Sequence, residues 1–112
     1  MKLRIIDYVG DRATDTEQGN KIYSLIIEGL KEKEIVELDF SNMKTILPTF
    51  LNNAIGALYK NYTSEYLNQY LKLKNLCKDD LSLLKRVIKN SKEFYENQEI
   101  LYYWYMYIGN VK

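Results

Sequence analysis

The stretch ILPTFLNNAIG, residues 46–56, contains Thr49, whose hydroxyl group is the best placed in this chain for a chemical role. Thr49 lies between Pro48 and Phe50, where an apolar run gives way to residues with helical spacing. A hydroxyl at a helix start can accept a hydrogen bond from a free backbone N–H and cap the helix. The same end of a helix favours negative charge, and phosphorylation would add about two negative charges there. The sequence therefore predicts a helix cap, a phosphorylation site, or both at Thr49.

Polar residues close to Thr49, or at the same end of the expected sheet, have ordinary interpretations as well as functional ones. Ser41, beside Asn42, is typical of a turn. Asp39 ends a hydrophobic strand, where a carboxylate accepts hydrogen bonds from loop N–H groups; a ligand-binding role at the strand end is the alternative. Asn52 and Asn53 fit a solvent-facing first helical turn or a partner surface. The predicted partner surface comprises Thr49 with Ser41, Pro48, Phe50, Asn52 and Asn53.

The composition excludes several ordinary reaction mechanisms. The 112 residues are 46% hydrophobic, which is enough apolar material for one compact domain. There is no histidine and one cysteine, Cys77, so intramolecular disulfides, zinc clusters and histidine-dependent triads are excluded. The sequence contains no glycine-rich phosphate loop and no recognisable nucleophile–base pair. We therefore expect no enzymatic activity, no catalytic or metal-binding residue and no cofactor.

The charge balance and hydropathy indicate where the chain works and what it binds. Sixteen basic and fifteen acidic residues give a net charge of +1, which supplies no overall field to attract nucleic acid. Lysines concentrate between residues 72 and 92, but acidic residues in the same segment dilute their field. No apolar run approaches the roughly 20 residues of a membrane span, and the charged N-terminus does not fit a signal peptide. We expect a cytoplasmic protein with a protein partner.

The strands expected to position Thr49 have two kinds of pattern. Residues 2–9 and 34–40 are rich in branched and aromatic side chains, and the second run is apolar enough to be a central strand. Residues 70–76 alternate leucine with lysine, which places Leu71 and Leu73 inward and both lysines outward. A loop is expected between the second strand and Pro48.

Three helices are expected between and after these strands, at about 13–34, 49–62 and 78–97. The first has Ile22, Ile26 and Leu30 at helical spacing, and Thr14 with Glu17 has the spacing of a capping box. The order βαβαβα predicts a small α/β domain with helices packed on a mostly parallel or mixed sheet.

The segment after residue 97 has a different character, because residues 101–108 are all aromatic or apolar. It fits an extension of the last helix, an edge strand or a segment that docks on another chain. Either the domain itself, residues 1–97, or a second subunit is expected to cover this extension, residues 98–112. The oligomer-interface candidates are Tyr102, Tyr103, Trp104, Tyr105 and Tyr107.

The run VELDFSNMKTILPTFLNNAIGALYKNY at 36–62 carries a family resemblance. It is preceded by the TEQG helix start at 16–19 and followed by YLKLKNLCKDDLSLLKRVIKNSKEFYEN at 70–97. Over about residues 10–97 the chain resembles the STAS-like domain family of bacteria and their phages. The most specific parts are LDF at 38–40, the pair Thr49-Phe50 about ten residues later, and LKLKNL before the last helix.

This family is similar in architecture to the STAS domains of anti-sigma factor antagonists, small α/β proteins that bind ATP-dependent kinases related to histidine-kinase ATPases. In those antagonists the kinase phosphorylates a serine or threonine at the start of the helix after the central strand, and phosphorylation breaks the complex. The resemblance implies a regulatory protein-binding module with Thr49 as the acceptor and an anti-sigma-like ATPase as its partner. The alternative is a non-enzymatic accessory protein that homodimerises through its aromatic segment.

Overall fold

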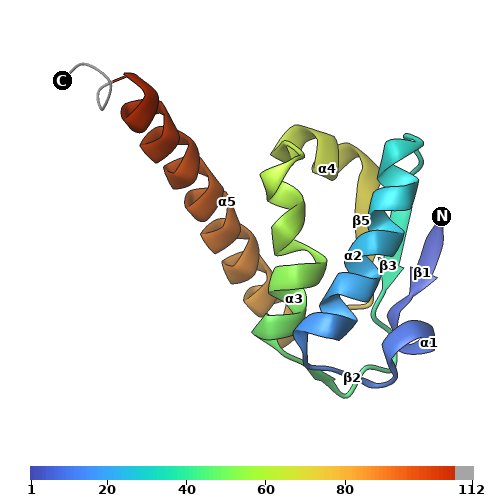
Figure 1. Cartoon of the computed structure of the whole chain (residues 1–112). Helices are drawn as coiled ribbons and strands as arrows, with labels where there is room; N and C mark the ends of the chain where they lie inside the picture. Colours follow the sequence, from blue (N-terminus) through green and yellow to red (C-terminus); the bar gives the residue numbers. More distant parts are fainter. Residues whose placement is uncertain (108–112) are drawn as a thin grey trace.

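A three-stranded parallel sheet forms the centre of the fold, with the strand order β1-β3-β5. The computed structural model describes the backbone of residues 1–107 and the side chains of residues 1–95. The strands are β1 (Lys2–Arg4), β3 (Val36–Asp39) and β5 (Leu71–Lys74), and they run side by side in Figure 1. Their register aligns Leu3, Leu38 and Leu73 in one row. The predicted α/β class and the central position of the 34–40 strand are confirmed.

The apolar sides of these strands pack against helices on one face of the sheet. Helix α2 (Thr16–Lys31) buries the stripe Ile22, Ile26 and Leu30, as its helical spacing predicts. Helix α3 (Pro48–Ala54) lies against α2, and α5 (Lys78–Tyr107) packs against α3. The alternation of β5 is confirmed, because Leu71 and Leu73 are half-buried whereas both lysines are exposed. One covered face thus contains the hydrophobic core.

The N-terminal strand is shorter than predicted. Only Lys2–Arg4 is strand, and a short helix, α1 (Ile5–Val9), occupies the rest of the segment expected as strand. Ile5 is fully buried, so packing overrides the β preference of the isoleucine pair. Gly10 ends α1 with φ 80°, a conformation that glycine adopts without steric strain.

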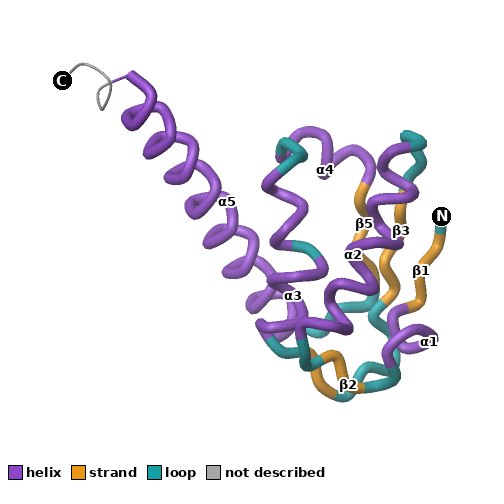
Figure 2. Tube along the Cα trace, viewed as in Figure 1, coloured by secondary structure: helices purple, strands orange, loops and turns teal. Residues whose placement is uncertain are grey.

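A second, two-stranded parallel sheet was not predicted. β2 (Arg12–Ala13) pairs with β4 (Thr45–Ile46). β4 lies in the predicted loop, and β2 includes Ala13, where a helix was expected to begin. Figure 2 shows this pair below the carboxyl ends of the main strands. Both strands are two residues long, so hydrophobic periodicity carries no signal for them. The pair connects the α1–α2 loop to the start of α3.

The capping box of α2 is one residue later than predicted. Asp15, not Thr14, is the N-cap, and its carboxylate accepts from the N–H of Gln18 at 2.8 Å. The Gln18 amide oxygen accepts from the backbone N–H groups of Thr14 and Asp15. Its amide nitrogen also donates to the carbonyls of Val9 and Arg12. Gln18 therefore fixes the whole loop before α2, which Glu17 could not do from its exposed position.

The helix predicted over 49–62 is divided into two. Helix α3 ends at Ala54, and a 3-10 helix, η1 (Gly56–Lys60), follows. A side chain at Gly56 would collide with Ser91 of α5, so this glycine permits close packing of η1 against α5. A further helix, α4 (Ser64–Tyr70), was not predicted; the hydroxyl of Thr63 caps it.

The last helix, α5, continues through the aromatic run to Tyr107, so the backbone follows the first of the three expectations for this segment. Asp79 and Asp80 occupy its first turn, as predicted for the positive end of a helix. Its distal part extends away from the sheet and the other helices (Figure 1). None of the described helices combines the length and apolarity that a membrane span requires.

Candidate partner-binding site

The start of α3 leaves the hydroxyl of Thr49 unused as a cap. Leu47 is the N-cap residue, and its hydrocarbon side chain makes no capping hydrogen bond. Pro48 is the first helical residue, a position that suits its fixed φ and its missing N–H. Thr49 is therefore the second residue inside the helix, and it is exposed. This corrects the helix-cap interpretation of Thr49, because the helix starts at Pro48, two residues earlier than that role requires.

The backbone donors at this helix start are already largely occupied. The N–H groups of Phe50 and Leu51 both donate to the Leu47 carbonyl, at 3.1 and 3.2 Å. Pro48 has no N–H to offer. A phosphate on Thr49 would therefore find little of the anion-binding capacity that a free helix start provides. It would remain a charge on the protein surface.

Phe50 anchors α3 in the core. Its side chain is 0% exposed, as is that of Leu51. A residue with no exposed surface cannot contact a partner, so the prediction of Phe50 as a partner-binding residue is wrong. The physical reason is the helical period: if Thr49 faces solvent, the next residue turns about 100° toward the sheet. Leu47, which was not predicted, is exposed and lies beside Pro48 on the surface.

Asn53 joins α3 to α2, whereas Asn52 faces solvent. The Asn53 amide donates to the Asn20 side chain at 3.1 Å and to the Thr16 carbonyl at 3.4 Å. The two helices approach closely here, because a Cβ atom on Gly19 would lie 2.8 Å from the Cβ atom of Asn53. Asn53 thus has a structural role, and Asn52 is the asparagine free to meet a partner.

A hollow of about 420 Å³ borders Asn52 and Asn53, between α3, η1 and α5. Its α5 side includes Asn90, Ser91 and Phe94. Phe94 is 55% exposed, which is unusual for a large aromatic side chain. The exposed start of α3 is therefore continuous with a concave surface that two aromatic side chains, Phe94 and Tyr95, help to line.

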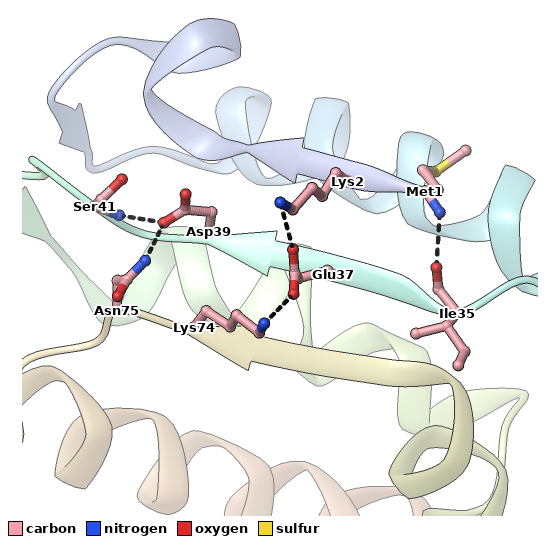
Figure 3. Close-up of polar contacts among 8 residues, drawn as sticks. All are labelled: Met1, Lys2, Ile35, Glu37, Asp39, Ser41, Lys74 and Asn75. Carbon is pink, nitrogen blue, oxygen red and sulfur yellow. Dashed lines mark hydrogen bonds and ion pairs between the residues drawn. The ribbon is translucent and has the colours of Figure 1, made fainter.

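Asp39 and Ser41 have the loop role that the sequence predicts. One Asp39 carboxylate oxygen accepts from the Asn75 side-chain amide at 2.8 Å and from the Ser41 backbone N–H at 2.9 Å, as Figure 3 shows. These two donors hold the pKa of Asp39 below its ordinary value, the bond from Asn75 having the larger effect. Asn75 was missed, although its place after the third strand and its φ of 63° are typical of asparagine in a turn.

Glu37 forms a second polar centre, which was not predicted from the sequence. Its carboxylate lies 2.6 Å from Lys74 Nζ and 3.7 Å from Lys2 Nζ, so it connects both outer strands to β3 (Figure 3). The hydrogen bond from Lys74 is the main cause of the lowered Glu37 pKa, and Glu37 in turn raises the pKa of Lys74. Apolar and charged residues alternate in VELD, as they do in the neighbouring strand LKLK. This alternation could have predicted that Glu37 shares one face of the sheet with the lysines.

The remaining predictions concern Cys77, metal binding and the aromatic C-terminal extension. Cys77 is exposed and not disulfide-bonded. Among the residues that the structure describes, no cluster of three histidine, cysteine, aspartate or glutamate side chains could hold a metal ion. The structure describes no side chain of the predicted 98–112 extension, which includes Tyr102, Tyr103, Trp104, Tyr105 and Tyr107.

A family model described as a STAS-like domain of unknown function matches residues 18–81. The matched range runs from the first turn of α2 to the first turn of α5, so it includes β3, α3 and Thr49. No curated protein and no solved structure matches the chain. The match covers more than half of the chain and includes two of the three strands of the main sheet, β3 and β5. The chain therefore belongs to the STAS-like domain family.

Proposed function

We propose that this chain is a regulatory, non-enzymatic protein-binding module whose partner surface is the exposed start of α3. The observation that carries this proposal is the state of Thr49: its side chain is exposed, and Leu47 rather than Thr49 is the N-cap. A kinase can reach such a hydroxyl without unfolding the helix. Leu47, Pro48 and Asn52 are exposed beside it and complete the contact surface.

The partner that fits this surface is a cytoplasmic ATP-binding kinase of the anti-sigma-like class, as the resemblance to anti-sigma factor antagonists implies. The free donors at the α3 start are few, so a phosphate on Thr49 acts as a surface charge of about −2. It separates the proteins by electrostatic repulsion and by the desolvation cost of burying a charge in the interface. The fold of the module itself is unchanged by the modification.

Co-purification of tagged variants from the native host tests this proposal. Thr49→Glu places a negative charge at the proposed contact, and Ser24→Glu places the same charge at an exposed position on α2. We expect the wild type and Ser24→Glu to retain an ATPase partner and Thr49→Glu to lose it. Equal retention by Thr49→Glu and the wild type would place the partner surface elsewhere.

A second candidate function is homodimerisation as an accessory protein. The observation that favours it is the course of α5, which continues as one helix to Tyr107 and extends away from the rest of the fold (Figure 1). A helix with this aromatic sequence is typical of a segment that associates with another helix. Deleting residues 100–112 and measuring the mass in solution separates the two candidates. Loss of a dimer with retained ATPase capture assigns assembly to α5 and regulation to α3.

A further inference from the structure

The face of the main sheet opposite the core carries two rows of alternating charge. The pairing register aligns Lys2, Glu37 and Lys72 in one row, and Arg4, Asp39 and Lys74 in the next. In Figure 3 the drawn members of both rows stand over the strands, and within the described residues no helix crosses in front of them. Parallel sheets are generally covered on both faces. This face therefore has room for a second layer that the described chain does not provide.

The carboxylates in the middle of both rows already have partners within the fold. Glu37 is only 15% exposed, and each of its oxygens faces a lysine. One oxygen of Asp39 accepts from both Ser41 and Asn75. Glu37 in particular has little remaining capacity for a cationic partner, because both of its oxygens are paired with lysines.

The flanking cations retain more capacity. The side chains of Lys2 and Lys74 are 82% and 60% exposed. Each ammonium has three donors, and Lys72 uses one of them on the Asn68 carbonyl at 2.7 Å. Arg4 lies 3.5 Å from Asp7 and presents five donors in total. The open face thus has two columns of cations, along β1 and β5, on either side of the two carboxylates of β3.

The spacing of the cation columns matches an α-helix. Adjacent strands lie about 4.8 Å apart, so β1 and β5 are separated by about 10 Å. This is close to the diameter of a helix with its side chains, about 10–12 Å. A helix lying along β3 would place its two flanks over the two cation columns and its central seam over Glu37 and Asp39.

We propose that the open face of the sheet binds an acidic helix of a partner protein, with carboxylates on both flanks and an uncharged seam. Such a helix would take the place of the second helical layer of a covered parallel sheet. Nucleic acid fits less well, because its uniform phosphate charge would also lie over the Glu37 and Asp39 carboxylates. This surface is formed by β1, β3 and β5, so the proposal does not depend on Thr49 or on the function proposed for α3.

Amide chemical shifts of the full chain, titrated with designed peptides at low salt, test the proposal. The probe is an alanine-based helical peptide of about 20 residues with glutamates on both flanks of an uncharged seam. An isomeric peptide carries the same number of glutamates along the seam. We expect the first peptide to shift amides of β1, β3 and β5 and the isomer to bind at least threefold more weakly.

Three variants test whether binding to the same surface becomes weaker, stronger or stays unchanged as its charges predict. Lys72→Gln removes a flanking cation and should weaken binding about two- to fivefold, the size of one exposed ion pair. Glu37→Gln removes the central anion and should strengthen binding by a similar factor. Lys85→Gln on the exposed surface of α5 is the matched control and should change nothing. Dispersed spectra and a cooperative melting transition well above the titration temperature verify that each variant is folded.

Several results would overturn the proposal. Equal weakening by Lys72→Gln and Lys85→Gln would show unspecific attraction to a charged peptide. Equal affinity for the two isomeric peptides would remove the role of the charge pattern. Stronger shifts of the same amides by a single-stranded oligonucleotide would reassign the face to nucleic acid. Absence of binding by the flanked peptide at low salt would leave the face as a solvated surface.

Discussion

Replacing Thr49 by alanine should leave the stability of the domain almost unchanged. The threonine lies inside α3 rather than at its N-cap, so the substitution removes no capping hydrogen bond. Alanine also has a higher helix propensity than threonine. We therefore expect a change in the free energy of unfolding within about 0.5 kcal/mol, the usual range for exposed substitutions.

Thr63 provides the matched comparison within the same chain. It is the N-cap of α4, and its hydroxyl accepts from the N–H of Tyr66 at 3.1 Å. Losing such a cap costs about 1 kcal/mol, and alanine gains no helix propensity at a non-helical N-cap position. For a domain of this size, Thr63→Ala should lower the melting temperature by about 4 °C, whereas Thr49→Ala should change it by less than about 2 °C.

Thermal and urea unfolding followed by circular dichroism measure this difference directly. The two variants make the same chemical change, so the comparison isolates the capping bond. A loss of stability in Thr49→Ala equal to that in Thr63→Ala would refute the reasoning. It would show that the Thr49 hydroxyl supports the fold and is not free for regulation.

Three further predictions test the packing and the electrostatics. Phe50→Ala should destabilise the domain by about 3–5 kcal/mol in urea unfolding, because the side chain is fully buried; a loss below about 1 kcal/mol would restore Phe50 as a surface residue. Gly19→Ala should cost about 1–3 kcal/mol, because its Cβ atom would lie 2.8 Å from both the Phe50 carbonyl oxygen and the Asn53 Cβ atom; wild-type stability would show that α2 and α3 are less closely packed. The pKa of Glu37 is lowered by Lys74 and that of Asp39 by Asn75, so their charged forms stabilise the fold fully above the ordinary carboxyl range, near pH 4, and progressively less as pH falls through the lowered values. Melting temperatures from pH 7 to pH 2 should show this loss, and Glu37→Gln should have a flatter profile; identical wild-type and mutant profiles would contradict the ion pairs.

The elements with strong periodicity could be predicted from the sequence. The helical spacing of Ile22, Ile26 and Leu30 predicted α2. The alternation of leucine and lysine predicted β5 and which of its faces points inward. The apolar run around Val36 and Leu38 gave a central strand. In each case one repeated pattern of burial spans at least four residues, so local sequence and tertiary packing favour the same structure.

Elements decided by single contacts could not be predicted in the same way. The segment around Ile5 has strand propensity, yet burial of Ile5 and the turn at Gly10 favour α1. The close approach of η1 to α5 depends on the absence of a side chain at Gly56, because a Cβ atom there would collide with Ser91, which is distant in the sequence. Such long-range contacts carry no signal in a short window of sequence.

The candidate site was predicted in position but not in detail. Thr49 is at the start of the helix after the central strand, as the resemblance implies. Which neighbours are exposed depends on which residues of α3 share its buried face. Phe50, Leu51 and Ala54 form that face, whereas Leu47 and Thr49 are exposed. The apolar character of Phe50 is typical of a core residue, and its prediction as a contact residue disregarded that signal.

Phosphorylation of the purified chain by its captured ATPase partner tests the central claim most directly. The wild type, Thr49→Ala and Thr63→Ala are each incubated with the ATPase and ATP, and the intact mass and the modified residue are determined by mass spectrometry. The account predicts one phosphate, located on Thr49, in the wild type and in Thr63→Ala, and none in Thr49→Ala. Phosphorylation of Thr49→Ala at the wild-type rate, or an unmodified wild type bound to an active ATPase, would contradict it.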